Sequence, residues 1–183
     1  MDNQKSEAKQ GRWIGINIVT VLALLLADQI SKYWAAHYLK AEGPIVILKE
    51  WFELHYLENK GAAWGMLNGK VWFLILFTMV MILGLLYLIN RIPNNRRYNF
   101  LRVSMLCIIA GAIGNLLDRV LYGYVVDFLY FKKINFPIFN IADIYVTVGA
   151  AIFCILFLFV YKDEELTFWS LKKNHKQMKE NGE

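Results

Sequence analysis

Long apolar runs separated by short polar segments dominate the pattern of this chain. An α-helix rises about 1.5 Å per residue, so roughly 20 apolar residues cross the hydrocarbon core of a bilayer. Four runs meet this requirement, at residues 13–34, 71–89, 101–117 and 141–161. The pattern therefore predicts four transmembrane helices.

Two segments between the runs have the period of a β-strand. The stretch from Phe52 to Tyr56 alternates apolar and polar residues, and residues 125–128 are also strand-like. We therefore expect an all-α integral membrane protein with four transmembrane helices and a small extracytoplasmic β-like subdomain. No polar linker divides the chain, which predicts a single membrane-embedded domain over residues 1–183, with residues 163–183 as a cytoplasmic tail.

Composition and charge agree with a membrane protein. The chain is 57% hydrophobic, and its net charge of +5 comes from basic residues that flank the apolar runs. Because these residues form no basic domain or aromatic-interleaved groove, we expect no nucleic-acid partner. The N-terminal flank, the 91–102 loop and the C-terminal tail hold most of the lysines and arginines. The positive-inside rule then places both termini in the cytoplasm.

The candidate chemistry lies at two aspartates at the membrane boundary. Asp118 follows the third run and Asp143 lies near the start of the fourth, so the hairpin between these spans brings both to one level. Ionisable residues at membrane depth are expensive and usually mark a functional site or a buried pair. Two carboxylates that share one proton can activate water and polarise a peptide carbonyl, which is aspartyl peptidase chemistry. The three histidines form no H-E-x-x-H pair, which argues against a zinc peptidase.

Residues around the two aspartates suit such a site, although each has a structural interpretation. Gly111, Asn115 and Asp118 fall on one helical face. Asn140 and Asp143 stand three residues apart, a spacing that equally suits an N-cap and an acid at a helix N-terminus. Arg119 can compensate the charge of Asp118.

Five segments carry a resemblance to the bacterial lipoprotein signal peptidases, also called signal peptidase II. The residues from Gly111 to Arg119 match the family signature G-x-x-G-N-x-x-D-R, and those from Phe139 to Asp143 match F-N-x-A-D. The other three are Asp28-Gln-Ile-Ser-Lys32, Asn59-Lys-Gly61-Ala-Ala-Trp64-Gly65 and Val125-Val126-Asp127-Phe128. All five follow the family order. Trp64 stands where the family most often has phenylalanine, which bears on pocket shape.

The resemblance implies an aspartic endopeptidase of the bacterial inner membrane, with Asp118 and Asp143 as its catalytic dyad. Its substrates would be diacylglyceryl-modified prolipoproteins, cut on the N-terminal side of the lipidated cysteine. The acyl chains would stay in membrane lipid while the scissile bond reaches an outward-facing dyad. The resemblance implies no metal and no organic cofactor, and nothing in the sequence demands an oligomer, so we expect a monomer.

The other matched residues are expected to bind substrate or support the dyad. Asn59 and Gly61 are expected to line the substrate cleft. Asn115, Arg119 and Asn140 are predicted to contact the substrate or the dyad.

Two further elements of the motifs have mainly structural interpretations. Asp28 and Lys32 are four residues apart on one helix and are expected to form an ion pair. Asp127 is expected to organise a loop rather than to act as a third catalytic acid.

Three other functions compete with this interpretation. A small proton-coupled transporter would use the same acids as a relay, but the second run offers almost no polar side chain. A serine–lysine peptidase would need Ser31 and Lys32, which point about 100° apart on one helix. A non-catalytic membrane scaffold would tolerate Asp118→Asn.

Overall fold

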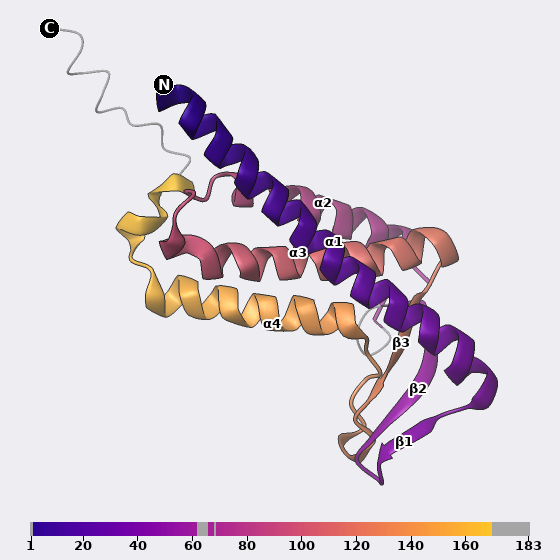
Figure 1. The fold of residues 1–183 in the computed structure, drawn as a ribbon. Coiled ribbons are helices and arrows are strands. Elements are labelled where there is room, and N and C mark those ends of the chain that lie inside the picture. Colours follow the sequence, from indigo (N-terminus) through magenta and orange to yellow (C-terminus); the bar gives the residue numbers. More distant parts are fainter. Residues whose placement is uncertain (1, 62–65, 68, 170–183) are drawn as a thin grey trace, which may run out of the picture.

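The computed structural model describes residues 2–61, 66–67 and 69–169. Its framework consists of four helices, each of which is long enough and apolar enough to cross a membrane. This confirms the predicted transmembrane architecture. Their bounds are α1 Asp2–Glu42, α2 Val71–Asn90, α3 Asn99–Tyr122 and α4 Ile141–Ile155, the last continuing as a π-helical turn over Leu156–Val160. Figure 1 shows the helices running side by side, with α3 in contact with each of the other three.

Two helices extend further than the apolar runs indicate. α1 continues past residue 34 to Glu42, where Ala35 and Leu39 are buried against the sheet. α3 continues past residue 117 to Tyr122 and ends at Gly123, whose left-handed φ of 76° suits glycine. Asp118 therefore lies one turn inside α3 rather than at its end.

A three-stranded antiparallel sheet covers one end of the bundle, which we call the sheet end (Figure 1). Its strands are β1 Ile45–Leu48, β2 Phe52–Asn59 and β3 Val125–Tyr130, in the order β1-β2-β3. Both predicted strand segments are thus confirmed. The register pairs Leu57 with Asp127, and successive residues of β3 face opposite sides. Val126 and Phe128 pack on α1, which leaves Asp127 on the other face.

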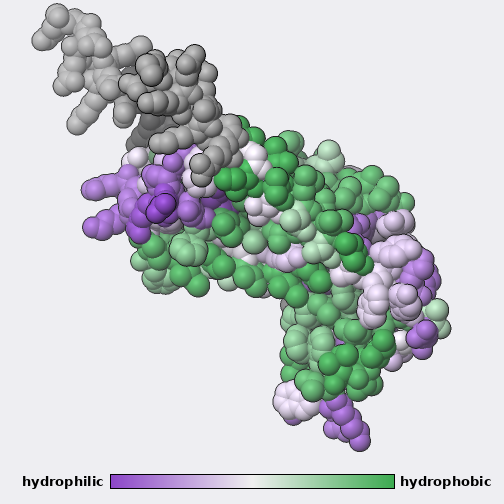
Figure 2. All heavy atoms as spheres, viewed as in Figure 1, coloured by the Kyte–Doolittle hydropathy of each residue, from purple (hydrophilic) through white to green (hydrophobic). Residues whose placement is uncertain are grey.

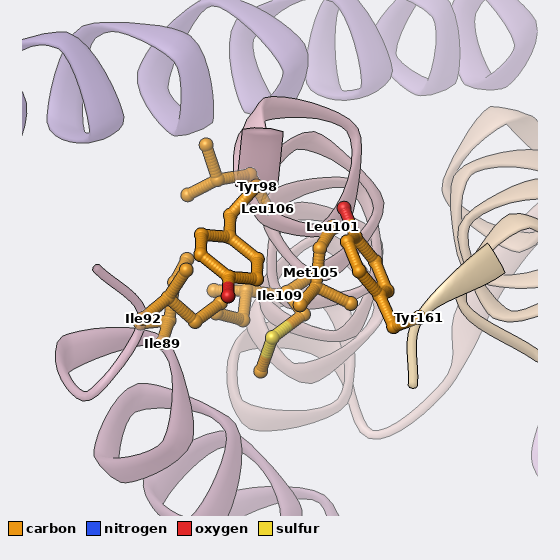
Figure 3. Close-up of a cluster of buried hydrophobic side chains, with 8 residues drawn as sticks. All are labelled: Ile89, Ile92, Tyr98, Leu101, Met105, Leu106, Ile109 and Tyr161. Carbon is orange, nitrogen blue, oxygen red and sulfur yellow. The ribbon is translucent and has the colours of Figure 1, made fainter. Parts of the chain in front are cut away.

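A large apolar cluster lies at the opposite end of the bundle, in addition to the cluster that packs between α1 and the sheet. Figure 3 shows eight buried side chains from α2, α3 and the adjoining loops around Met105, which is fully buried. They are Ile89, Ile92, Tyr98, Leu101, Met105, Leu106, Ile109 and Tyr161. Many large apolar residues of α1, α2 and α4 are instead exposed on the bundle, as the green surface in Figure 2 shows. Lipid as the surrounding solvent explains such a surface.

The expected tail begins with an ordered segment. Asp163–Trp169 form a 3-10 helix at the opposite end of the bundle from the sheet (Figure 1). The Trp169 indole donates to the Leu88 carbonyl over 3.0 Å, and the Arg97 guanidinium donates to Glu165 over 2.9 Å. The first part of the expected tail, Asp163–Trp169, thus packs on the bundle, and residues 170–183 lie outside the described residues.

Small residues let α3 and α4 approach closely. A Cβ added at Gly111 would meet the Ala142 carbonyl oxygen and lie 2.8 Å from a Val146 methyl carbon. Because these neighbours include rigid backbone, Gly111→Ala is expected to lower the free energy of unfolding by about 1–3 kcal/mol. Thermal unfolding in detergent, followed by loss of the monomer peak, measures this effect.

Gly84 on α2 is the matched control for this substitution. No atom lies within 4 Å of a Cβ added there. Gly84→Ala is therefore expected to leave the melting temperature unchanged or slightly raised. Equal melting temperatures for Gly111→Ala and Gly84→Ala would contradict the close α3–α4 contact.

Candidate active site

A cavity of about 1040 Å³ lies where the sheet meets α3 and α4. Asp127 of β3 and Asp143 of α4 both line it. The polar part of the lining also includes Asn59, Gly61, Asn115 and Arg119. Ile144, Thr147 and Val148 of α4 also line the cavity, so its lining combines polar side chains with a mainly apolar part of α4.

Asp143 is held at the first turn of α4. The Asn140 side-chain oxygen accepts from the Asp143 N–H over 3.0 Å, and the Asn140 N–H donates to Asp143 Oδ2 over 3.1 Å. This reciprocal capping box confirms the N-cap interpretation. Asp143 Oδ1 accepts a further hydrogen bond of 2.8 Å from Asn115 Nδ2. The Asp143 side chain thus both caps α4 and lines the cavity.

Asp127 is the second aspartate in the cavity lining, and its side chain is buried. Its carboxylate accepts from Asn59 Nδ2 over 2.8 Å and from Asn140 Nδ2 over 2.6 Å. Burial, reinforced by the nearby charge of Asp143, raises the pKa of Asp127 to about 7, although the two amide donors oppose the shift. Asn140 touches both aspartates, so one side chain couples their positions.

Asp118 is directed away from this cavity. Its carboxylate lies 3.0 Å from Lys32 Nζ and also accepts from Gln29 Nε2 and the Val126 N–H. It lines a smaller cavity of about 510 Å³ between α1 and the end of α3. The expectation that Asp118 and Asp143 meet in one site is therefore not supported by the geometry, because Asp118 faces α1.

Asp28 and Lys32 form the ion pair expected from their spacing, 3.0 Å long and almost fully buried. Asp28 Oδ1 also accepts from the Ala142 N–H over 3.0 Å, which ties α1 to the start of α4. The Ser31 hydroxyl donates to the Asp28 carbonyl over 2.6 Å. Ser31 is thereby bonded to its own helix backbone, an arrangement that does not favour a serine–lysine pair.

Arg119 and Asn59 fix the edge of the cavity. The Arg119 guanidinium donates to the Gly61 carbonyl over 3.2 Å, and the Gly61 N–H donates to Asn59 Oδ1 over 2.9 Å. Asn59, Gly61 and Arg119 all line the cavity. The remainder of that motif, 62–65 with Trp64, lies outside the described residues.

Gln29 is a site residue that the sequence analysis did not single out. Its amide donates to Asp28 Oδ2 over 3.1 Å and to Asp118 Oδ1 over 3.2 Å. A glutamine inside an apolar run, next to an aspartate, is the signal that could have identified it.

The fold and the site together define a class of protein: a helical membrane protein with two aspartates in the lining of one large cavity. Comparisons with known proteins agree. The family model described as "Signal peptidase (SPase) II" matches residues 20–159. The chain belongs to the signal peptidase II family, whose members are aspartic proteases.

Curated relatives and solved structures support this membership. The chain is 46% identical to the lipoprotein signal peptidase of Caldanaerobacter subterraneus subsp. tengcongensis over 143 residues, which cover 78% of this chain and 95% of the relative. It is 43% identical to that of Clostridium tetani over 150 residues, covering 80% and 92%. A bacterial membrane enzyme solved by the in meso method at 2.3 Å matches with a TM-score of 0.70 and 32% identity, covering 87% and 94%. Another, at 1.9 Å, matches with a TM-score of 0.68 and 34% identity, covering 81% and 96%.

Membership of this family makes the chain a multi-pass bacterial membrane protein that removes signal peptides from prolipoproteins.

Proposed function

We propose that this protein is an aspartyl endopeptidase that cuts diacylglyceryl-modified prolipoproteins on the N-terminal side of the lipidated cysteine, with Asp127 and Asp143 as its catalytic dyad. The observation that carries the proposal is that these two aspartates line one large cavity and are linked through Asn140. Asp127 thus takes the role expected for Asp118, which is paired with Lys32 elsewhere.

The dyad performs hydrolysis by sharing one proton. The ionised aspartate takes a proton from water, and the oxygen of that water forms a bond to the peptide carbonyl carbon. The protonated aspartate donates to the carbonyl oxygen and stabilises its developing charge. Collapse of the tetrahedral intermediate breaks the C–N bond as a proton passes to the nitrogen. The products are the carboxylate of the signal peptide and the free amine of the lipidated cysteine.

The mainly apolar part of the cavity lining supports a lipidated substrate. Ile144, Thr147 and Val148 lie on α4, within the segment that is apolar enough to span the membrane. A diacylglyceryl group bound there would keep its acyl chains in lipid while the peptide reaches the polar residues of the cavity. Asn59 and the backbone at Gly61 also line the cavity and are expected to contact an extended peptide.

The charge distribution supports an outward-facing site. The basic segment 91–102, which joins α2 to α3 and includes the start of α3, lies at the opposite end of the bundle from the sheet, as does the start of α1 (Figure 1). The positive-inside rule assigns that end to the cytoplasm, so the dyad faces the outer membrane surface. We also propose that one chain is sufficient for the reaction, because all the side chains proposed for it come from one chain.

A cleavage assay in liposomes tests this function. The substrates are a diacylglyceryl-modified prolipoprotein and its unlipidated form, and cleavage is followed by gel shift. Only the lipidated substrate is expected to be cut, with the cysteine at the new N-terminus in mass spectrometry. Equal cleavage of both substrates, or a cut elsewhere, would refute the proposed specificity. If neither substrate were cut, a vesicle proton-flux assay would test the transporter alternative.

The activity is expected to fall as the pH rises through about 7. The dyad needs one proton, and the raised pKa of Asp127, about 7, means that this proton is bound at lower pH and lost at higher pH. The pH dependence of kcat/KM reports groups of the free enzyme. We expect an alkaline limb with a midpoint near pH 7. A constant kcat/KM from about pH 6 to pH 9 would contradict this role of Asp127.

A further inference from the structure

A buried ammonium group lies behind the proposed dyad, outside the large cavity. Lys32 is 3% exposed, and its Nζ lies 3.0 Å from each of three oxygens. These belong to Asp28, Asp118 and Asn115. An ammonium group has three N–H donors and no acceptor, so the three oxygens use all of them.

The contact between Lys32 and Asn115 fixes the orientation of the Asn115 side-chain amide, that is, the directions in which its Oδ1 and Nδ2 point. Asn115 Oδ1 accepts from Lys32 Nζ and, over 3.1 Å, from Asn140 Nδ2. Because both partners are donors in this arrangement, the acceptor end of the Asn115 amide must face them. The other end, Nδ2, is then directed to Asp143 Oδ1 over 2.8 Å.

We propose that Lys32 is a positioning residue, which acts on the reaction by holding the Asn115 amide so that its N–H group is donated to Asp143. The inference rests on the proposed function of Asp143. Asp28 and Asp118 accept the other two N–H donors of the Lys32 ammonium.

The loss of Lys32 would reverse the Asn115 amide. Its three oxygen partners surround one point, so removal of the ammonium leaves the carboxylates of Asp28 and Asp118 close to Asn115 without their cation. An amide N–H is the donor that can replace it. When Asn115 Nδ2 turns toward these carboxylates, its oxygen turns toward Asp143. Asp143 then keeps the backbone N–H of Asn140 but loses the side-chain donor that supports its charged form.

A double-mutant cycle on kcat tests the inference, with Lys32→Met and Asn115→Leu measured singly and together at saturating lipidated substrate. Each single change is expected to lower kcat by about 100-fold, which is within the range that general acid–base catalysis contributes to a rate. Because both remove the same N–H donation to Asp143, the double variant is expected to be no slower than the slower single variant. KM for Lys32→Met is expected to change less than about threefold, since Lys32 does not line the large cavity.

Asp28→Asn is the matched control, because it removes one Lys32 ion pair but leaves the Lys32–Asn115 contact. Its effect on kcat is expected to add to that of Asn115→Leu. A purely structural Lys32 would lower the yield of folded enzyme and give fully additive effects with Asn115→Leu, and additivity would overturn the inference. If Lys32→Met alone does not fold, the cycle is run with Asp28→Asn as the background, where one carboxylate fewer is left unpaired.

The proposed dyad has a separate readout in the same assay. If Asp143→Asn cuts substrate as fast as the wild type, the proposed function fails. If Asp143→Asn is inactive and the Lys32–Asn115 cycle is additive, only the positioning role of Lys32 fails.

Discussion

Asp127→Asn is expected to lower kcat by about a thousandfold or more while the protein remains folded and binds substrate. An amide has the shape of the carboxyl group but can neither share the dyad proton nor take one from water. Many other residues line the cavity with Asp127, so the charge of Asp127 is not needed for the substrate to bind. Steady-state cleavage of the lipidated prolipoprotein gives kcat, and elution as a monodisperse peak confirms the fold.

Asp143→Asn provides the control for a dyad that acts as a unit. Its loss in kcat is expected to match that of Asp127→Asn, and the double variant is expected to be no slower than either single one. Residues that act as a unit are strongly non-additive in this way. Independent, multiplying losses would show that the two aspartates do not serve one step.

Asp118→Asn is expected to lower the stability of the protein more than its kcat. The change removes the charge that faces Lys32 at 3.0 Å in a buried site, which leaves the ammonium with Asp28 as its one remaining carboxylate partner. Breaking a buried ion pair from one side costs about 3 kcal/mol. The melting temperature in detergent is therefore expected to fall well below that of the wild type. The rate per folded molecule should fall far less than in Asp127→Asn.

The stability of Asp127→Asn, relative to that of the wild type, is expected to increase as the pH rises from about 4 to about 7. The pKa of Asp127 is raised from 3.8 to about 7, so the folded state penalises the charged form. In the wild type this penalty is absent below about pH 4, grows as the pH rises toward 7 and is complete above it. Asp127→Asn removes the penalty, so its melting temperature should gain on the wild type across that range. A difference that does not change with pH would contradict the raised pKa.

The architecture could be predicted from the sequence because its signals are local. Twenty-residue apolar runs define the helices, period-two alternation defines β2, and the strand-like residues 125–128 indicate β3. The cap at Asn140 follows from its spacing to Asp143, and the Asp28–Lys32 pair follows from an i, i+4 spacing. Each of these features depends on residues within one element.

The partner that we propose for Asp143 could not be predicted in this way. Asp118 was expected there because the third apolar run ends beside it, but α3 continues to Tyr122, and Asp118 meets Lys32 of α1. That contact joins residues far apart in sequence. Asp127 enters the cavity through the pairing of Leu57 with Asp127, a long-range register that the alternation of β3 alone does not specify.

The polarity of the amides around the dyad was likewise beyond sequence reasoning. Asn59, Asn115 and Asn140 were all expected near the site, yet the direction of each amide depends on donors from other elements. Lys32 comes from α1, 83 positions before Asn115. Only the assembled fold shows that these side chains form one hydrogen-bonded network.

The most direct test compares single-turnover cleavage of a diacylglyceryl-modified prolipoprotein by Asp127→Asn and Asp118→Asn at equal amounts of folded enzyme. A dyad of Asp127 and Asp143 predicts that Asp118→Asn still releases the signal peptide, while Asp127→Asn holds the substrate uncut. Cleavage by Asp127→Asn together with complete loss in a folded Asp118→Asn would contradict the assignment and return Asp118 to the dyad.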